Sequence, residues 1–162
     1  MIKVDQALNF VLESINTLPS EEVILTDSLG RVLAEDVYVE EPIPFLGNSA
    51  MDGYAVKATD TEGATKDKPR TLEVIESIKA GTLASKTLSQ NQAIKIMTGA
   101  PVPESADSIV IVEDTQSQNQ NQVKIFKEAK AQQHIRKSGE DFAKGELAIG
   151  KGTLINAAHA GI

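Results

Sequence analysis

The feature that most constrains the fold is a series of short apolar runs, separated by turn-forming residues, that begins after Pro44. Residues 72–78 and 93–97 largely alternate between apolar and polar side chains, which is typical of a half-buried strand. Residues 108–112 form an almost continuous apolar run, as a strand buried on both faces would. We therefore predict a mainly β region of short strands after Pro44.

Two stretches of this region are interpreted as connections between strands. Residues 116–122 contain only Gln, Asn and Ser, and they predict a solvated hairpin loop before a strand at residues 123–126. The Asp52-Gly53 pair stands directly before the run at residues 54–56, and on spacing alone this pattern favours a hairpin turn.

The first segment of the chain has helical spacing instead. Apolar residues recur three and four positions apart, which predicts an amphipathic helix that Pro19 ends: Val4, Leu8, Val11, Leu12, Ile15 and Leu18. A short strand is expected at residues 22–26 and a turn at residues 27–30. The predicted fold class is therefore mainly β with an N-terminal helix (α+β). Residues 157–162 look like the beginning of a helix, so we expect the chain to be part of a longer protein.

The composition excludes several classes of site and partner. Among 162 residues there is no Cys, which rules out disulfides and a cysteine nucleophile, and the two His make a His-based zinc site unexpected. Aromatic residues are 4% and the net charge is −7, which argues against a nucleic-acid partner. No apolar run approaches the length of a membrane span and no signal peptide is evident, so we expect a cytoplasmic protein without a membrane partner.

Three segments place polar side chains beside turn-forming residues. Residues 48–56 carry Asp52, and residues 97–103 carry Thr98 at a Gly/Pro corner that suits an anion or phosphate. A purely structural interpretation, as a turn and as a strand end, remains open for both.

The third segment, residues 134–141, has three potential cations before a glycine turn with two carboxylates. Arg136 and Lys137 could hold an oxyanion, while Glu140 or Asp141 could hold Mg²⁺ or a proton. The alternative for this segment is a solvated charged loop.

The order of the motifs along the chain resembles one family. The sequence reads Asp-Ser-Leu-Gly-Arg-Val-Leu-Ala-Glu-Asp-Val at 27–37, Pro-x-Pro at 42–44, Asn-Ser-Ala-Met-Asp-Gly-Tyr-Ala-Val at 48–56, Ile-Met-Thr-Gly-Ala-Pro-Val-Pro at 96–103 and Arg-Lys-Ser-Gly-Glu-Asp at 136–141. This succession is similar to the N-terminal region of the molybdopterin molybdenumtransferase family, which includes MoeA and the gephyrin E-domain. The resemblance covers essentially the whole chain.

The resemblance implies a domain organisation. It implies an elongated two-domain fragment with irregular coiled β-sheets and an inserted small β domain. Residues 1–44 would be the first part of domain I, residues 45–143 the inserted domain II, and residues 144–162 the return to domain I, truncated before a pterin-binding domain. A full-length protein of this kind is expected to be a homodimer.

The resemblance also implies an activity. Proteins of this family insert molybdate into adenylylated molybdopterin and release AMP in a Mg²⁺-dependent step of molybdenum cofactor biosynthesis. Expected partners are therefore Mg²⁺, the two substrates and the enzyme that supplies the adenylylated pterin. The family's cleft residues carry over to Asp52, Thr98 and Asp141 as catalytic residues, with Asp52 or Asp141 as a possible Mg²⁺ ligand.

The resemblance also bears on the activity of this chain by itself and leaves one alternative function. The chain lacks the family's pterin-binding domain, so by itself it is expected to be inactive. The alternative function is an interaction or scaffold module of the gephyrin type, without a catalytic role.

Overall fold

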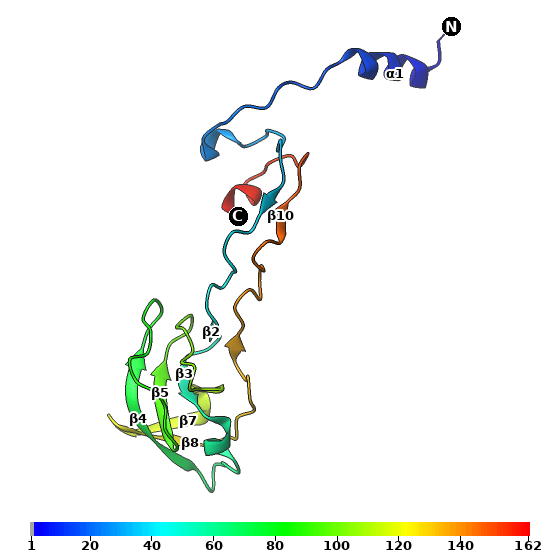
Figure 1. The fold of residues 1–162 in the computed structure, drawn as a ribbon. Helices are drawn as coiled ribbons and strands as arrows, with labels where there is room; N and C mark the ends of the chain where they lie inside the picture. The colour runs from blue at the N-terminus through cyan, green and yellow to red at the C-terminus, as the bar shows by residue number, and fades with distance from the viewer. Residues whose placement is uncertain (1) are drawn as a thin grey trace. The chain divides into compact units, whose positions relative to one another are not determined.

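The computed structural model describes residues 2–162 and shows a mainly β chain with one α-helix at its N-terminus, which confirms the predicted fold class (Figure 1). The chain forms two compact units. One contains the residues up to Val37 together with Leu147–Ile162, and the other is Tyr38–Glu146. The domain boundaries inferred from the resemblance, after residues 44 and 143, stay a prediction.

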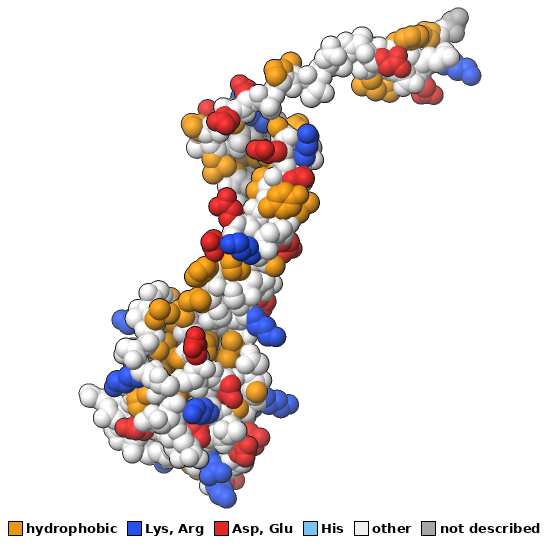
Figure 2. Space-filling view, in the orientation of Figure 1, with side chains coloured by type: hydrophobic (Ala, Val, Ile, Leu, Met, Phe, Trp, Pro, Cys, Tyr) orange, Lys and Arg blue, Asp and Glu red, His pale blue; other side chains and the backbone are white. Residues whose placement is uncertain are grey.

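The N-terminal helix is shorter than predicted. Helix α1 spans Val4–Ser14, and Ile15 is already extended, with φ −100° and ψ 125°. No side chain of α1 is buried, and Figure 2 shows hydrophobic side chains exposed along it. Most helical stability in proteins comes from packing of the apolar face, so a helix without such packing ends early. The expectation that the helix continues to Pro19 was wrong.

The strand expected at residues 22–26 is also absent. The backbone there has no regular structure until the 3₁₀ helix η1 (Leu25–Asp27), and no other segment pairs with it within residues 2–162. The turn expected at residues 27–30 is confirmed, with Gly30 at φ +76°. At the other end of the chain, the expected helix start is a single 3₁₀ turn, η4 (His159–Gly161).

Two short strands pair near the boundary of the units. They are β1 (Val37–Tyr38) and β10 (Leu147–Ile149). Within the first unit, the chain before β1 also lies beside the chain after β10. Leu33 N–H donates to the Thr153 carbonyl there at 2.9 Å. Within residues 2–162, no helix is long and apolar enough to span a lipid bilayer.

The second unit contains a six-stranded sheet with the order β6-β3-β5-β4-β8-β7. All neighbouring strands are antiparallel except β4 and β5, which are parallel. The strands are β3 (Gly53–Val56), β4 (Arg70–Ile78), β5 (Gln92–Ile96), β6 (Ser108–Ile111), β7 (Thr115–Asn119) and β8 (Gln122–Ile125). The 3₁₀ helices η2 (Ala58–Thr61) and η3 (Val112–Asp114) follow β3 and β6.

The sheet is buried on both faces. Neighbouring residues of one strand enter different apolar clusters, as Tyr54 and Ala55 of β3 do, and as Ile109 and Val110 of β6 do. The prediction that the run at residues 108–112 is buried on both faces is therefore confirmed for β6. The alternating runs at 72–78 and 93–97 are confirmed as strands β4 and β5, each of which has both buried and exposed residues.

The Gln/Asn-rich tract is more regular than expected. It was predicted to be a solvated hairpin loop, and it does lie in a hairpin, but its first residues form strand β7 along β8. Only Gln120 and Asn121 lie between the two strands. The β7 side chains after Thr115 are exposed, so polar residues are accepted in a strand at the edge of the sheet.

A second pair of short strands leads into the sheet. They are β2 (Asn48–Ser49) and β9 (Ile135–Arg136), which pair antiparallel with Asn48 opposite Arg136 and Ser49 opposite Ile135. The same two chain segments stay together farther from the sheet, where Ile43 and Phe142 form an isolated bridge. This pairing places the first and third predicted site segments side by side.

Candidate functional site

The structure joins two of the three predicted site residues directly. Asp52 Oδ1 accepts a hydrogen bond from the Thr98 backbone N–H and another from the Thr98 hydroxyl, each at 2.7 Å. Asp52 directly precedes β3, and Thr98 follows β5, its antiparallel neighbour. The two residues therefore meet at one end of this strand pair, and both side chains are exposed.

The contacts of Asp52 keep its carboxylate ionised. The hydrogen bond from the Thr98 backbone N–H is the main cause of a lowered pKa at Asp52, and the bond from the Thr98 hydroxyl adds to it. The positive charge of Lys95 lowers the pKa further. Lys95 is exposed on β5, and its place in the alternating run gave no sign in the sequence that its charge acts on Asp52.

Backbone contacts hold the corner that carries Thr98 against strand β2. Gly99 N–H donates to the Ser49 carbonyl at 2.9 Å, and Ser49 N–H donates to the Ala100 carbonyl at 3.0 Å. The buried Ser49 hydroxyl donates to the Met51 carbonyl at 2.6 Å and so fixes the bend just before Asp52. Gly99 has φ +79°, a conformation that favours glycine, which explains the Thr-Gly order at this corner.

Gly53 has a role that the hairpin interpretation did not predict. The Asp52-Gly53 pair is not a hairpin turn: Gly53 is the first residue of β3, and its two neighbours in the sheet are Ile96 and Ile111. A Cβ at this position would overlap the Val110 carbonyl oxygen and lie 2.9 Å from the carbonyl carbon. The residue is glycine because the β6 backbone approaches it closely, not because the chain turns there.

The third predicted residue, Asp141, belongs to a separate ion pair. Arg136 Nη2 donates to both oxygens of Asp141 at 2.7 Å, and Arg136 Nε lies 3.8 Å from Glu140 Oε1. The backbone N–H of Lys137 also donates to Glu140 Oε2 at 2.9 Å. In the described part of the chain, no hydrogen bond or ion pair connects Asp141 to Asp52 or Thr98.

The expectation that Arg136 holds an oxyanion is therefore corrected. Its guanidinium is already paired with the two carboxylates of its own loop, so it offers little free positive charge. The same pairing lowers the capacity of Asp141 to bind Mg²⁺, because both of its oxygens already accept hydrogen bonds from the Arg136 guanidinium.

The carboxylates of the site leave one free oxygen that could bind Mg²⁺. Among residues 2–162, no three His, Asp or Glu side chains converge in a way that could hold a metal ion. Asp52 Oδ1 is occupied by Thr98, whereas Oδ2 accepts no hydrogen bond from the described residues. Mg²⁺ in phosphate-transferring sites is often held by one or two carboxylates, substrate phosphates and water. Asp52 Oδ2 fits the role of one such ligand.

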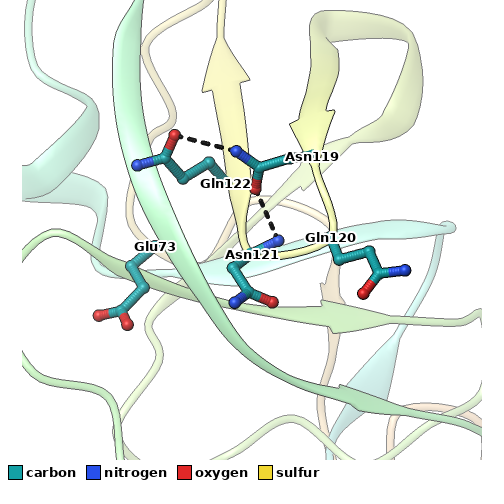
Figure 3. Close-up of a pocket in the computed structure, with 5 residues that line it drawn as sticks. All are labelled: Glu73, Asn119, Gln120, Asn121 and Gln122. Atoms are coloured by element: carbon teal, nitrogen blue, oxygen red, sulfur yellow. Dashed lines mark hydrogen bonds between the residues drawn. The ribbon is translucent and has the colours of Figure 1, made fainter.

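An open hollow of about 620 Å³ lies elsewhere, at the turn between β7 and β8 (Figure 3). It is lined by Glu73 of β4 and by the residues of that turn: Asn119, Gln120, Asn121 and Gln122. Several of its polar groups bond to one another or to β5, as Asn121 N–H does to Asn119 Oδ1 at 2.9 Å, and Gln92 Nε2 to Glu73 Oε2 at 3.0 Å. It contains none of the predicted site residues, and we do not assign a function to it.

Comparison with known proteins agrees with the motifs and with the fold. Residues 2–162 match the family described as MoeA N-terminal region (domain I and II). The chain is 40% identical over 158 residues to the molybdopterin molybdenumtransferase of Bacillus subtilis, an alignment that covers 95% of this chain and 36% of the relative. It is 41% identical over 162 residues to molybdopterin molybdenumtransferase 2 of Mycobacterium tuberculosis, covering 100% of this chain and 40% of the relative.

A solved structure shows the same architecture. The crystal structure of a molybdopterin biosynthesis MoeA protein from Pyrococcus horikoshii matches with a TM-score of 0.90 and 34% identity, over 97% of this chain and 41% of that one. The chain thus spans about two fifths of the length of these proteins. On sequence and structure together, this chain belongs to the family of MoeA N-terminal regions, domains I and II.

Proposed function

We propose that this chain is the N-terminal part of a molybdopterin molybdenumtransferase, which inserts molybdate into adenylylated molybdopterin and releases AMP. Family membership supports a role in molybdenum cofactor biosynthesis. The observation that carries the proposal is the Asp52–Thr98 pair, an exposed and ionised carboxylate held in one orientation by two hydrogen bonds of 2.7 Å.

In this proposal Asp52 is the residue that acts on the reactants. Because the Thr98 bonds engage Oδ1, the free Oδ2 faces no competing donor from the described residues. It can accept a proton or hydrogen bond from a bound reactant, or serve as one ligand of Mg²⁺. Bound Mg²⁺ would neutralise charge on the phosphate oxygens of the leaving nucleotide.

Thr98 has a different role from the one expected for it. A hydroxyl has a single proton, and the Thr98 hydroxyl donates it to Asp52. It is therefore not free to donate to a phosphate oxygen while that bond exists. We infer that Thr98 acts by orienting Asp52 and keeping it ionised.

Asp141 and the wider assembly complete the proposal. Asp141 forms an ion pair with Arg136, and the charges of the two side chains cancel. We propose that Asp141 also contributes to the function. The longer protein is proposed to act as a homodimer that receives adenylylated molybdopterin from the enzyme that makes it.

The proposal is tested with Asp52→Asn in the longer protein. Asn keeps the size and one acceptor oxygen but removes the negative charge, and we expect AMP release from adenylylated molybdopterin to fall about 100-fold. The control is Asp114→Asn, which removes the charge of a partly exposed carboxylate that pairs with Lys127 at 3.4 Å. Equal activity of both variants would contradict a catalytic role for Asp52, and it would favour a scaffold module instead.

A further inference from the structure

The connection between β4 and β5 has an unusual form. Because the two strands are parallel, the chain must return from the end of one to the start of the other, which proteins usually accomplish with a helix. Residues 79–91 make this return without a helix or a strand. Such a segment needs other contacts to hold one conformation.

One carboxylate supplies several of these contacts. Glu76 Oε1 and Oε2 each accept a hydrogen bond from the Ser85 backbone N–H at 3.1 Å, and Oε1 accepts another from the Ser85 hydroxyl at 2.9 Å. Oε2 also accepts a bond from the Lys86 backbone N–H at 3.0 Å. The Lys86 ammonium group donates to the Ile75 carbonyl at 2.7 Å, which is a further bond between this part of the connection and β4.

The position of Glu76 within β4 explains how it reaches the connection. The register between β4 and β5 shifts between Val74 and Glu76, so a bulge lies immediately before the carboxylate. Bulges re-aim side chains, and they are common beside functional sites. The hydrogen bonds from Ser85 hold the pKa of Glu76 below its ordinary value, so the carboxylate is ionised and its bonds are charge-assisted.

The first part of the same connection lies against the corner that carries Thr98. Met97 N–H donates to the Ile78 carbonyl at 3.2 Å, where β4 ends and the connection begins. A Cβ placed on Gly99 would lie 3.7 Å from the Ala80 side chain, which is van der Waals contact. Figure 1 shows the connections after β4 and after β5 at the same end of the sheet.

We propose that Glu76 is a positioning residue for the Asp52–Thr98 site: it holds residues 79–86 in place, and this segment in turn supports the corner at Thr98 and Gly99. Its contacts with the corner are the van der Waals approach of Ala80 to Gly99 and the hydrogen bond from Met97 N–H to Ile78 at the start of the segment. The expected effect of Glu76 on catalysis rests on the proposed function, whereas its expected effect on the Thr98 corner does not.

The structural consequence is tested in this chain by amide hydrogen exchange of Glu76→Gln. Gln keeps the shape but loses the charge, and we expect exchange at Ser85 and Lys86 to become about tenfold faster, since charged acceptors bind more strongly. Exchange at the Thr98 amide should also become faster, which a purely local role would not produce. The matched control is Glu73→Gln on the same strand, whose carboxylate bonds only to Gln92 among the described groups. Unchanged exchange at Thr98 in Glu76→Gln would overturn the proposal.

The catalytic consequence is tested in the longer protein. Misplacement of a site by a distant contact can cost up to about 100-fold in rate, and we expect Glu76→Gln to lower kcat for AMP release at least several-fold with an unchanged melting temperature. Ser85→Ala, which removes only the hydroxyl donor, should have a smaller effect of the same kind. If Asp52→Asn is fully active, the proposed function fails. If Asp52→Asn is impaired while Glu76→Gln matches Glu73→Gln, only the positioning role fails.

Discussion

Asp141 and Arg136 form a two-pronged ion pair in which one guanidinium nitrogen lies 2.7 Å from each carboxylate oxygen. The two residues lie on one exposed loop, with side chains 46% and 40% exposed respectively. An exposed pair of this kind adds little to folding stability, because water and salt screen it and because ordering two side chains costs entropy. Its geometry does fix where the Asp141 carboxylate is presented.

Replacement of Asp141 should therefore affect function more than stability. For Asp141→Asn we expect the free energy of unfolding to change by less than about 1 kcal/mol, while molybdate insertion by the longer protein falls. Thermal denaturation and AMP release measure the two effects, with Asp114→Asn as the control for loss of an exposed ion pair. A large loss of stability with normal turnover would show that Asp141 is structural.

Thr98 should control the ionisation of Asp52. In the folded chain the pKa of Asp52 lies below its ordinary value of 3.8, so its bonds to Thr98 stabilise the fold at neutral pH. This contribution is lost as the pH falls below 3.8 and through the lowered pKa. Thr98→Val removes the hydroxyl donor and keeps the backbone N–H, so the pKa of Asp52 should rise toward its ordinary value.

An NMR titration of the Asp52 carboxyl carbon measures this shift. Thr98→Ser keeps the hydroxyl and serves as the control, with an expected pKa equal to that of the original chain. If the value in Thr98→Val also stays unchanged, the hydroxyl bond has no part in holding the charge.

Gly53 should not tolerate any side chain. In Gly53→Ala the new Cβ would overlap the backbone of Val110, so β3 and the edge strand β6 would have to separate. We expect a loss of about 2 kcal/mol or more in the free energy of unfolding, measured by chemical denaturation. Gly150→Ala is the control, since the nearest atom there is 4.0 Å away and no positive φ is required. Equal stabilities of the two variants would refute the close-approach explanation.

The chain by itself should fold and yet be catalytically inactive. The second unit has two buried apolar clusters of its own, which is a sufficient core for cooperative unfolding. The chain spans only about two fifths of its relatives, and the proposed reaction requires a pterin-binding part. Denaturation followed by circular dichroism tests the first expectation. AMP release from adenylylated molybdopterin by these 162 residues alone would contradict the second.

The sequence by itself determined strands β3, β4, β5, β6 and β8 of the six-stranded sheet, but not the edge strand β7, which was expected to be part of a loop. Alternation over residues 72–78 and the apolar run at 108–112 report burial directly, because side chains in a strand point to opposite faces. The resemblance assigned Asp52, Thr98 and Asp141 to one cleft; the first two are hydrogen-bonded neighbours, and the shared catalytic role of the three stays a prediction.

Only the tertiary structure decided how the residues at these positions are used. Asp52-Gly53 has the local pattern of a hairpin turn, yet Gly53 is required by the β6 backbone, which is distant in the sequence. Arg136 looked like an anion site until its partner Asp141 was located. Helix α1 ends before Pro19 because none of its side chains is buried against another segment. Helical periodicity in the sequence shows which face is apolar, but not whether anything packs against that face. For Gly53 the deciding contact involves a partner distant in the sequence, whereas Arg136 and Asp141 are close in the sequence and only the folded loop shows that they pair.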